Sequence, residues 1–494
     1  MSVDRFITDG QSGPAVRWVT PILVLVVLLG AAPPPGKAAA GLPGTAVAPA
    51  PERIAWDDLV ETVERTSPLM SAARSGLDAM EAQLRQAQWA RFPTFRLEAG
   101  GTPTPEIQTD GFDLDVNFSR WGYFYRVSAT MIQPVYAFGR IAALRSAARS
   151  GVDVGRARVD VARWELRVRM AQAYYGVLLS KELSTILDDG RRWLAKAEDR
   201  MERLRVADSD DYDQMEHLRL KTRSSELFQL EADQRSLDIT SRAGLRLLLS
   251  RPSSRAVEPA ATTLAPIEIG ALSVDRLLAA MERHHPRLRM ARAAGLAKGA
   301  LADGKAAELW PQVVFVADAS VNDSNVLKTE GTLMEGETLG YSIAVLLGMR
   351  WHLDVPQRLA IRDKARAEAQ AALAQVDVAR DLAEIEVRRV YQGLQDKRAL
   401  IGIYAKSRKA AKGWLTAAWD THDAGFGSFR NVMDALLQHY SKRLAHLQAV
   451  HEYNIMVHEL SRAVGMDVAT LGQTGAVKHL NDGGPGASDV PVTP

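Results

Sequence analysis

A phosphate-binding loop is the first candidate for chemistry in this sequence. Residues 299–305 fit the GxxxxGK pattern, but Ala306 stands where a Ser or Thr must hold Mg²⁺. The stretch also lies in a helical pattern that no strand precedes, so we interpret it as a chance match. No GxSxG nucleophile elbow occurs in the chain.

Histidines are the second candidate for chemistry. The candidate side chains are His284, His285, His446, His451 and His458. None has the HExxH spacing of a zinc site, so we expect them to be ordinary residues on helix surfaces. The sequence therefore predicts a protein that is not an enzyme and that needs no metal or other cofactor.

The composition narrows the class of protein further. The 494 residues carry a net charge of +2, which gives no electrostatic argument for a nucleic-acid partner. With 47% hydrophobic and 24% charged residues, the chain is neither disordered nor a polytopic helical membrane protein. Cysteine is absent, which excludes disulfides, thiolate metal sites and an acylated N-terminal Cys.

The N-terminal region has the pattern of an export signal. Basic residues precede an apolar run at 18–32 and small residues follow it at 38–40, which predicts a signal peptide over 1–40. The alternative is an uncleaved anchor, although a spanning helix needs ~20 apolar residues. A linker rich in Pro and Ala is expected over 41–55.

A duplication organises the rest of the chain. The pentapeptide VDVAR occurs at 159–163 and again at 376–380, with Pro and Tyr-Gly features in the same order around both. We expect two repeats of one plan, a helix, two strands and a long helical hairpin, over 56–270 and 271–470. The tail at 471–494, rich in Gly and Pro, is expected to be disordered.

Proline-free stretches predict long helices. No Pro occurs between Pro134 and Pro252, or between Pro356 and Pro485. Because Pro breaks helix interiors, each stretch allows long uninterrupted helices. A helix over 139–206 would be ~100 Å long at about 1.5 Å per residue, which is longer than one globular core requires.

Two apolar seams run along this first long helix. One seam comprises Val161, Trp164, Val168, Ala171, Tyr175 and Leu178, and the other comprises Leu166, Met170, Ala173 and Val177. Two seams fit a helix that packs on both sides as a stave in a ring, and the alternative is a helix in a two-layer bundle. Gly and acidic residues at 207–211 and 423–427 predict the turns of two antiparallel hairpins.

Ahead of each long helix, alternating segments predict strands. The four segments are 95–99, 125–131, 313–321 and 341–351. We expect the polar connections at 102–122 and 322–340 to be long loops. The last segment has an apolar row with aromatic ends, as a strand that faces lipid would: Tyr341, Ile343, Val345, Leu347, Met349 and Trp351. The alternative is a soluble β-subdomain.

Four strands do not close a β-barrel in lipid, because an open edge leaves backbone groups without hydrogen bonds. Two copies of the chain would supply eight strands and three copies would supply twelve. Only the larger barrel leaves an open lumen, so the pattern favours three copies.

Together these features resemble the TolC-like outer-membrane efflux proteins, the outer-membrane factors of tripartite efflux and type I secretion systems. The resemblance rests on IQPVYAFGR at 132–140, on Tyr174 and Tyr175 in the next helix, and on GFGSFRNVMD at 425–434. It extends over residues 56–468. It implies an α+β membrane protein, a trimeric twelve-stranded β-barrel with four strands per chain, continued by a long periplasmic α-helical barrel of coiled hairpins.

The same resemblance implies a function. Such a protein is a passive exit duct in the outer membrane of a Gram-negative bacterium, projecting into the periplasm. Small molecules or polypeptides reach it from a periplasmic adaptor (membrane fusion protein) and an inner-membrane pump. Its implied partners are further copies of itself, the adaptor, the pump and outer-membrane lipid, without nucleic acid. The alternative is a soluble periplasmic coiled-coil scaffold or adaptor protein.

A periplasmic constriction is also implied by the resemblance. Family members form an acidic ring with their second hairpin; Asp434 falls on one of its positions and Asn431 replaces the other carboxylate. Asp213 lies at a similar distance past the first turn. Three copies of Asp434 would repel one another and attract cations, so the closed state would respond to pH and cations. The alternative is that Asp434 is an ordinary solvated residue.

Adaptor docking in the family falls on the hairpin turns. The corresponding residues are Gly425, Phe426 and Gly427 in the second turn and Val206, Ala207 and Asp208 in the first. The first turn lacks the glycine that the family usually has there. Acidic residues surround it: Asp208, Asp210, Asp211 and Asp213. They either complement a basic adaptor tip or are simply solvated.

Overall fold

The computed structural model describes residues 52–110, 113–208, 212–250, 257–330 and 340–471. The expected signal peptide, most of the linker and nearly all of the tail lie outside these residues. Two short strands, β1 (Glu52–Ile54) and β4 (Val257–Pro259), pair in parallel. The end of the expected linker is therefore part of a strand pair that closes the first half of the chain.

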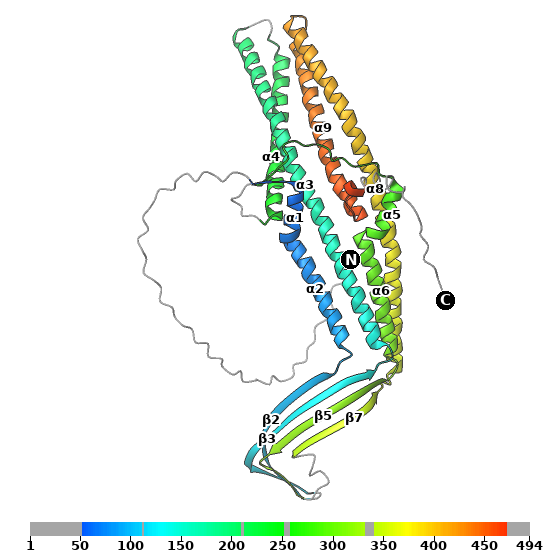
Figure 1. The fold of residues 1–494 in the computed structure, drawn as a ribbon. Coiled ribbons are helices and arrows are strands. Elements are labelled where there is room, and N and C mark those ends of the chain that lie inside the picture. The colour runs from blue at the N-terminus through cyan, green and yellow to red at the C-terminus, as the bar shows by residue number, and fades with distance from the viewer. Residues whose placement is uncertain (1–51, 111–112, 209–211, 251–256, 331–339, 472–494) are drawn as a thin grey trace, which may run out of the picture. The chain divides into compact units, whose positions relative to one another are not determined.

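Long helices dominate the described chain. The first half contains α1 (Trp56–Thr66), α2 (Pro68–Trp89), α3 (Arg140–Val206) and α4 (Gln214–Leu248). The second half contains α5 (Val274–His284), α6 (Pro286–Ala307), α8 (Val355–Asp423) and α9 (Phe429–Val464). Because α3 and α8 span 67 and 69 residues, the prediction of very long helices is confirmed. Figure 1 shows the two hairpins, α3 with α4 and α8 with α9.

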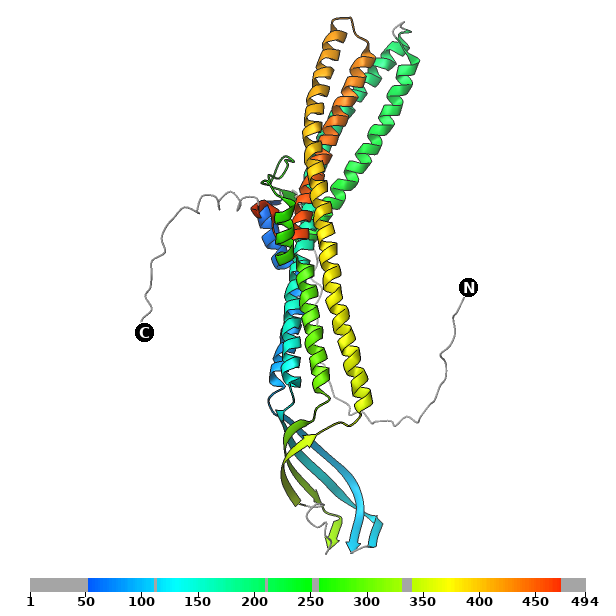
Figure 2. The same ribbon diagram turned by 90° about the vertical axis from the view of Figure 1, so that its right-hand side faces the viewer.

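The seams of α3 are buried as predicted. Leu166, Met170, Ala171 and Val177 are almost inaccessible to solvent. Contacts of α3 with α2, α4, α6 and α9 surround it on several sides (Figure 2). The arms of the first hairpin also approach closely, since a Cβ atom on Gly176 would lie 2.3 Å from Oγ of Ser241 on α4.

Two apolar cores lie within the helical part. The first is built mainly from α1, α3 and α4 around Leu59, Met170 and Leu245. The second is built from α5, α6, α8 and α9 around Leu288 and Leu460. Burial of large aliphatic side chains contributes about 1.5–3 kcal/mol each, so these cores hold the hairpins at their bases.

The strands form one mixed sheet. Its members are β2 (Thr94–Asp110), β3 (Asp113–Tyr136), β5 (Gln312–Ser324), β6 (Leu327–Glu330) and β7 (Gly340–Arg350). Their order is β6-β2-β3-β5-β7 (Figure 1). Neighbours are antiparallel except β6, which runs parallel to β2. The four predicted strands are confirmed, and β6 was not predicted.

The connection at 102–122 is not the loop that we expected. β2 and β3 continue through it, paired from Thr94 with Ile132 to Asp110 with Asp113, apart from a register shift after Pro105. The segment is polar because this part of the hairpin needs no apolar face. Backbone pairing maintains the strands there, together with an ion pair of 3.5 Å between Arg120 and Glu106, and apolar alternation does not reveal either contact.

Candidate functional site: sheet faces and hairpin tips

One face of the sheet is apolar across its four long strands. The rows on this face are Phe95, Met131, Ala317 and Val345; Leu97, Ala129, Ala319 and Ile343; and Ala99, Val127, Val321 and Tyr341. Ile343 and Tyr341 are 79% and 83% exposed in the single chain. A continuous exposed apolar face of this kind marks a surface that meets lipid or protein.

The opposite face of the same strands is polar except in the row nearest the helices, which contains Ile132, Val316 and Leu346. One row is Glu98, Ser128, Ser320 and Ser342, and the next is Arg96, Thr130, Asp318 and Ala344. Oγ of Ser320 lies 2.9 Å from Oγ of Ser342, and the Thr130 hydroxyl donates to Asp318 at 2.7 Å. A sheet with one apolar and one polar face separates a hydrocarbon side from a water side, as in membrane β-barrels.

Aromatic side chains lie at both ends of the apolar rows. Where the strands meet the helices they are Trp89, Phe92, Tyr136, Phe138, Trp310 and Trp351. Phe138 stacks on Trp310 with 5.9 Å between ring centroids. At the far end of the rows lie Tyr125 and Tyr341. Amphipathic rings favour such positions at the two surfaces of a bilayer.

Trp351 lies outside the strand in which we expected it. β7 ends at Arg350, and the Trp351 indole Nε1 donates to the backbone oxygen of Leu309 at 3.1 Å. The chain leaves the sheet here because the partner strand β5 begins at Gln312, and Pro311 before it has no NH to pair with residue 351. The remaining residues of the predicted row lie on β7 and are exposed: Tyr341, Ile343, Val345, Leu347 and Met349.

The sheet has two edges that lack full partners. β7 pairs only with β5, and β2 pairs with β6 only over residues 107–110 in the part of the chain that the structure describes. From Thr94 to Glu106, the outer edge of β2 carries no strand within the described ranges. The four long strands of one chain therefore do not close on themselves.

The second hairpin turns at a glycine with an exposed aromatic beside it. Gly425 has φ of +82°, a conformation that favours glycine, and Phe426 is 90% exposed. The Phe426 NH donates to the Thr421 oxygen at 3.0 Å. Gly427 is held close to the end of α8, because a Cβ atom there would lie 3.0 Å from the His422 nitrogen.

At the first hairpin, Val206 ends α3 and is 74% exposed. The Ala207 NH donates to the Arg203 oxygen at 3.0 Å, and Asp208 has a positive φ of 47°. Glycine adopts such a left-handed conformation most readily, and in this chain an aspartate occupies the position. The predicted acidic residues Asp210 and Asp211 lie outside the described residues.

The three residues predicted for the constriction lie in different settings. Asp213 caps the N-terminus of α4, where its Oδ1 accepts from the Met215 NH at 2.8 Å. Asp434 and Asn431 are exposed on α9. Asp434 lines a hollow between α4 and α9 together with Glu216 and Arg430, whereas Asp213 is not among the residues of this hollow.

An aromatic contact joins the two hairpins near their tips, and the sequence analysis did not identify it. Trp193 of α3 lies 5.2 Å from Trp419 of α8 and 6.4 Å from Phe429 of α9, measured between ring centroids. The Arg200 guanidinium lies over the Phe429 ring at 4.9 Å. No local signal pointed to this contact, because Trp193 lies 13 residues before the end of α3 whereas Phe429 is the first residue of α9.

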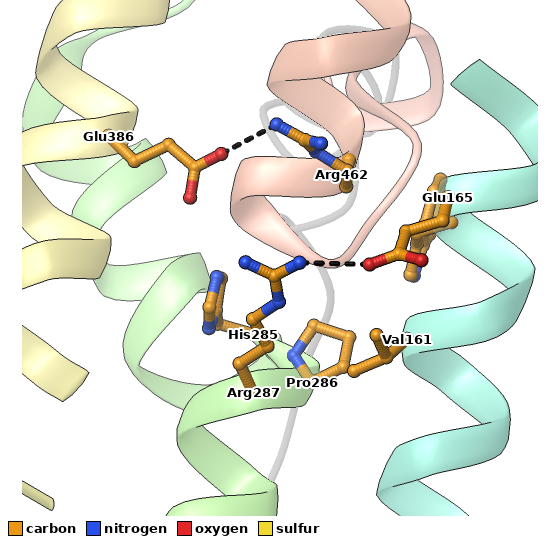
Figure 3. A pocket seen from close by; sticks show the side chains of 8 residues that line it. Val161, Glu165, His285, Pro286, Arg287, Glu386 and Arg462 are labelled. Atoms are coloured by element: carbon orange, nitrogen blue, oxygen red, sulfur yellow. Dashed lines mark hydrogen bonds and ion pairs between the residues drawn. The ribbon is translucent and has the colours of Figure 1, made fainter. Parts of the chain in front are cut away.

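A pocket at the base of the hairpins contains two ion pairs (Figure 3). Arg287 on α6 binds Glu165 on α3 at 2.8 Å, and Arg462 on α9 binds Glu386 on α8 at 2.7 Å. His285 is buried beside them, and its Nδ1 accepts from the Leu288 NH at 3.1 Å. Burial lowers the pKa of His285, so the ring stays neutral and caps α6.

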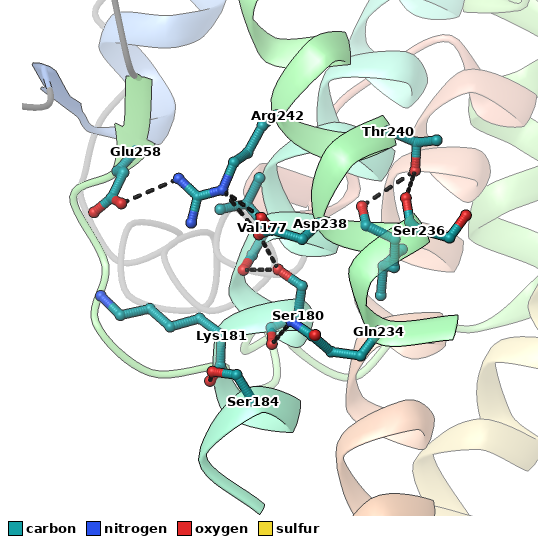
Figure 4. A network of polar contacts seen from close by, with 11 residues as sticks. Val177, Ser180, Lys181, Ser184, Gln234, Ser236, Asp238, Thr240, Arg242 and Glu258 are labelled. Carbon is teal, nitrogen blue, oxygen red and sulfur yellow. Dashed lines mark hydrogen bonds and ion pairs between the residues drawn. The ribbon is translucent and has the colours of Figure 1, made fainter. Parts of the chain in front are cut away.

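A second polar network fastens α4 to its neighbours (Figure 4). The buried Ser180 hydroxyl on α3 donates to Asp238 on α4 at 2.8 Å. Arg242 donates to Asp238 at 2.8 Å and to Glu258 of β4 at 3.1 Å. All partners are satisfied within the network, so it joins α3, α4 and β4 without a free group for a ligand.

Comparison with known proteins decides the family. The sequence profile of the family described as outer membrane efflux protein matches residues 59–207 and 277–466. The chain belongs to this family. It is therefore an efflux duct of the outer membrane of Gram-negative bacteria, serving tripartite pumps, and the alternative of a soluble scaffold is not favoured. The family is a channel family and not an enzyme family.

Solved outer membrane efflux proteins share the fold. VceC of Vibrio cholerae is 16% identical with a TM-score of 0.68, covering 84% of this chain and 96% of VceC. The open state of the Neisseria gonorrhoeae MtrE channel is 18% identical with a TM-score of 0.68, covering 84% and 89%. The Campylobacter jejuni CmeC channel is 12% identical with a TM-score of 0.69, covering 86% and 89%. No curated protein matches the chain.

His285 and His458 of this efflux protein differ from the expectation of surface positions, whereas His284 is exposed as expected. His458 is buried with its ring centroid 4.5 Å from that of Trp56 and 6.0 Å from that of Tyr175. Burial lowers the pKa of His458 to about 4. The expectation was wrong because α9 packs against α1 and α3 as well as against α8, which its own sequence does not reveal.

The described residues contain neither a cluster of metal ligands nor a helix that could span a membrane. Their His, Asp and Glu side chains form no group of three that could hold a metal ion. No helix among them is sufficiently long and apolar to cross a membrane.

Proposed function

We propose that three copies of this efflux protein form one duct, with a twelve-stranded barrel in the outer membrane and a helical barrel in the periplasm. The observation that carries the proposal is a sheet with an apolar face, a polar face and two unpaired edges. In lipid, each unpaired backbone group would cost several kcal/mol. Pairing β7 of one copy with β2 of the next satisfies these groups and keeps the strands antiparallel.

The polar face supports three copies rather than two. An eight-stranded barrel has an interior that its own side chains fill, whereas a twelve-stranded barrel leaves room for water. Arg96, Glu98 and Arg126 project from the polar face and are exposed. Charged side chains of this size need a solvated lumen, which the larger barrel provides.

An internal duplication is consistent with this arrangement. The order α1, α2, β2, β3, α3, α4 is followed by α5, α6, β5, β7, α8, α9. The two apolar cores follow this division only in part, since the first core also includes Leu447 and Val450 of α9. We infer that the two halves are equivalent staves, so three chains would place six similar units around the lumen.

The hairpin turns are the proposed docking points for a periplasmic adaptor. Val206 and Phe426 expose large apolar side chains at the two turns. Asp208 places a carboxylate next to Val206. An adaptor tip with apolar and basic residues would match both features, and the inner-membrane pump beyond it would supply the energy for transport.

Asp434 is the proposed constriction residue, with Asn431 one helical turn before it on the same helix. Three copies of Asp434 near one axis would attract cations and hold the closed duct sensitive to divalent ions. Arg430 lies 3.8 Å from Glu216, so α4 and α9 are already linked by charge at this level. Asp213 is retained only as a helix cap in this proposal.

Conductance of the purified protein in planar bilayers tests the duct and its constriction together. We expect discrete openings in the wild type that divalent cations reduce. Asp434→Ala should raise the conductance and remove the cation effect, because the carboxylates that bind the cation are gone. Asp381→Ala makes the same charge change at an exposed position of α8 that lies far from the turn, and it should behave like the wild type.

Each failure has its own meaning. A wild type that never inserts and stays soluble in lipid-free buffer contradicts the duct. A wild type that conducts while Asp434→Ala and Asp381→Ala respond identically contradicts only the assignment of Asp434.

A further inference from the structure

Two histidines of α9 lie in a setting that the duct itself does not require. His439 and His446 are about two helical turns apart, so they project from the same face of α9. The Nδ1 atoms of both are buried and have no hydrogen-bond partner among the described residues. Buried polar atoms without partners are uncommon in folded proteins and call for an explanation.

The charges that α8 and α9 place around these rings are positive. Arg408 and Lys412 on α8 and Arg443 on α9 act on His439, and Arg408 also acts on His446. Neither Arg408 nor Lys412 forms an ion pair with any residue that the structure describes. The backbone of Ile401 is the one group on α8 that favours the protonated form of His446.

The third helix beside these histidines, α3, only partly compensates the positive charge around them. Asp189 lies 4.0 Å from Arg443, at the limit of an ion pair. Arg192, also on α3, acts with Asp189 and Arg443 on Tyr440, whose ring lies 5.7 Å from that of His439. Counting both helices and α3, cations outnumber carboxylates around the imidazoles.

Both imidazoles are therefore held neutral. Burial lowers the pKa of His439 and of His446, and nearby cations lower it further, with Arg443, Lys412 and Arg408 acting on His439 and Arg408 on His446. A proton added to either ring would enter a partly buried space in which cations dominate, and the buried Nδ1 atoms have no acceptor there. Such a proton is tolerated only if the ring moves into water.

We propose that the contact between α8 and α9 at His439 and His446 is an acid-sensitive joint, in which protonation of the two imidazoles loosens the second hairpin. A released histidine takes up its proton near pH ~6.5, whereas the packed ring resists it. The joint is thus fully packed above that pH and weakens as the pH falls below it. This inference goes beyond the duct, because it concerns one hairpin of one chain.

Hydrogen–deuterium exchange of the purified full-length protein in detergent tests the joint. Amide protection of residues 404–416 and 436–450 is compared between about pH 7.5 and about pH 5.5, after correction for the intrinsic pH dependence of exchange. We expect the wild type to lose protection there severalfold at the lower pH, because the released rings take up protons that the packed rings resist. The double variant His439→Gln, His446→Gln should keep its protection at both pH values.

A third histidine on the same helix provides the matched control. Burial lowers the pKa of His451, but its charged neighbour is Glu452 and no cation acts on it. His451→Gln should therefore respond to acid like the wild type. Loss of the response in His451→Gln would show that histidine burial in general, and not the cationic setting, is the cause, which overturns the proposal.

The exposed cations supply a second route in case the double histidine variant does not fold. Arg408→Gln with Lys412→Gln removes both α8 charges at exposed positions. This variant should lose part of the acid response, because the protonated rings then meet less repulsion while the larger effect of burial remains. An unchanged response in it, or equal protection of the wild type at both pH values, contradicts the acid-sensitive joint.

Discussion

At the residue scale, Asp213 and Asp434 show how local structure gives two aspartates different roles. Asp213 precedes α4 and accepts from the NH groups of Met215 and Glu216 at 2.8 and 3.4 Å. Asp434 lies within α9, exposed, and caps no helix. The first carboxylate is accounted for by helix capping, whereas the second remains available to ions.

Asp213→Ala should destabilise the first turn of α4 by about 1 kcal/mol, because two NH groups lose their acceptor. Faster amide exchange in residues 214–220 would report this loss, and Asp213→Asn should largely restore protection. Channel conductance and its cation dependence should stay at wild-type values in both variants. A loss of cation sensitivity in Asp213→Ala would instead move the constriction to the first hairpin.

At the element scale, the sequence predicts what depends on local pattern. The proline-free stretch after Pro134 and the Gly425 turn placed α3 and the second reversal within a residue or two of their observed limits. Period-two alternation found the apolar centres of the strands. Both signals work because each reflects a backbone rule that acts on neighbouring residues.

Features that depend on distant partners were missed. β1 and β4 are only three residues each, and they form strands because they pair with each other across the first half of the chain. The burial of His458 depends on Trp56, which is remote in sequence. The clustering of Trp193 with Phe429 likewise requires both hairpins to be in place. No local pattern contains this information.

A charged substitution should have opposite effects on the two faces of β7. Ile343→Lys places a charge on the apolar face and should cost about 2–4 kcal/mol near the middle of a bilayer. Ala344→Lys, the next residue, puts the same charge on the polar face and should be tolerated. The measurement is the fraction of heat-modifiable oligomer recovered from outer membranes. Equal recovery of the two variants would contradict lipid contact at the apolar face.

At the scale of the whole molecule, the helical part and the sheet differ in whether one chain can complete them. The helical cores are complete within one chain: one joins α1, α3 and α4 with residues of α9, and the other joins α5, α6, α8 and α9. The sheet is incomplete within one chain, since β7 and β2 leave edges without partners in the described ranges. Assembly is therefore demanded by the sheet, and the number of copies follows from how the edges meet.

Cysteine pairs across the proposed edges would count the copies directly. The chain has no native cysteine, so every disulfide comes from the introduced residues. Glu98→Cys on β2 is combined in turn with Ser342→Cys, Ala344→Cys or Leu346→Cys on β7, all on the polar face. Within one chain, Glu98 and Ser342 are three strands apart, or about 14 Å, which is beyond the reach of a disulfide.

Cross-links in these variants must therefore join different chains. We expect one of the three pairs to match the register and to give bands of one, two and three chains, with no larger species, because the third chain returns to the first. Either single-cysteine variant alone should give no ladder, since equivalent edges do not face each other in a head-to-tail ring. A ladder that ends at two chains would mean an eight-stranded barrel with a filled interior. Such a barrel could not serve as a duct, so this outcome would contradict the trimer and the solvated lumen together.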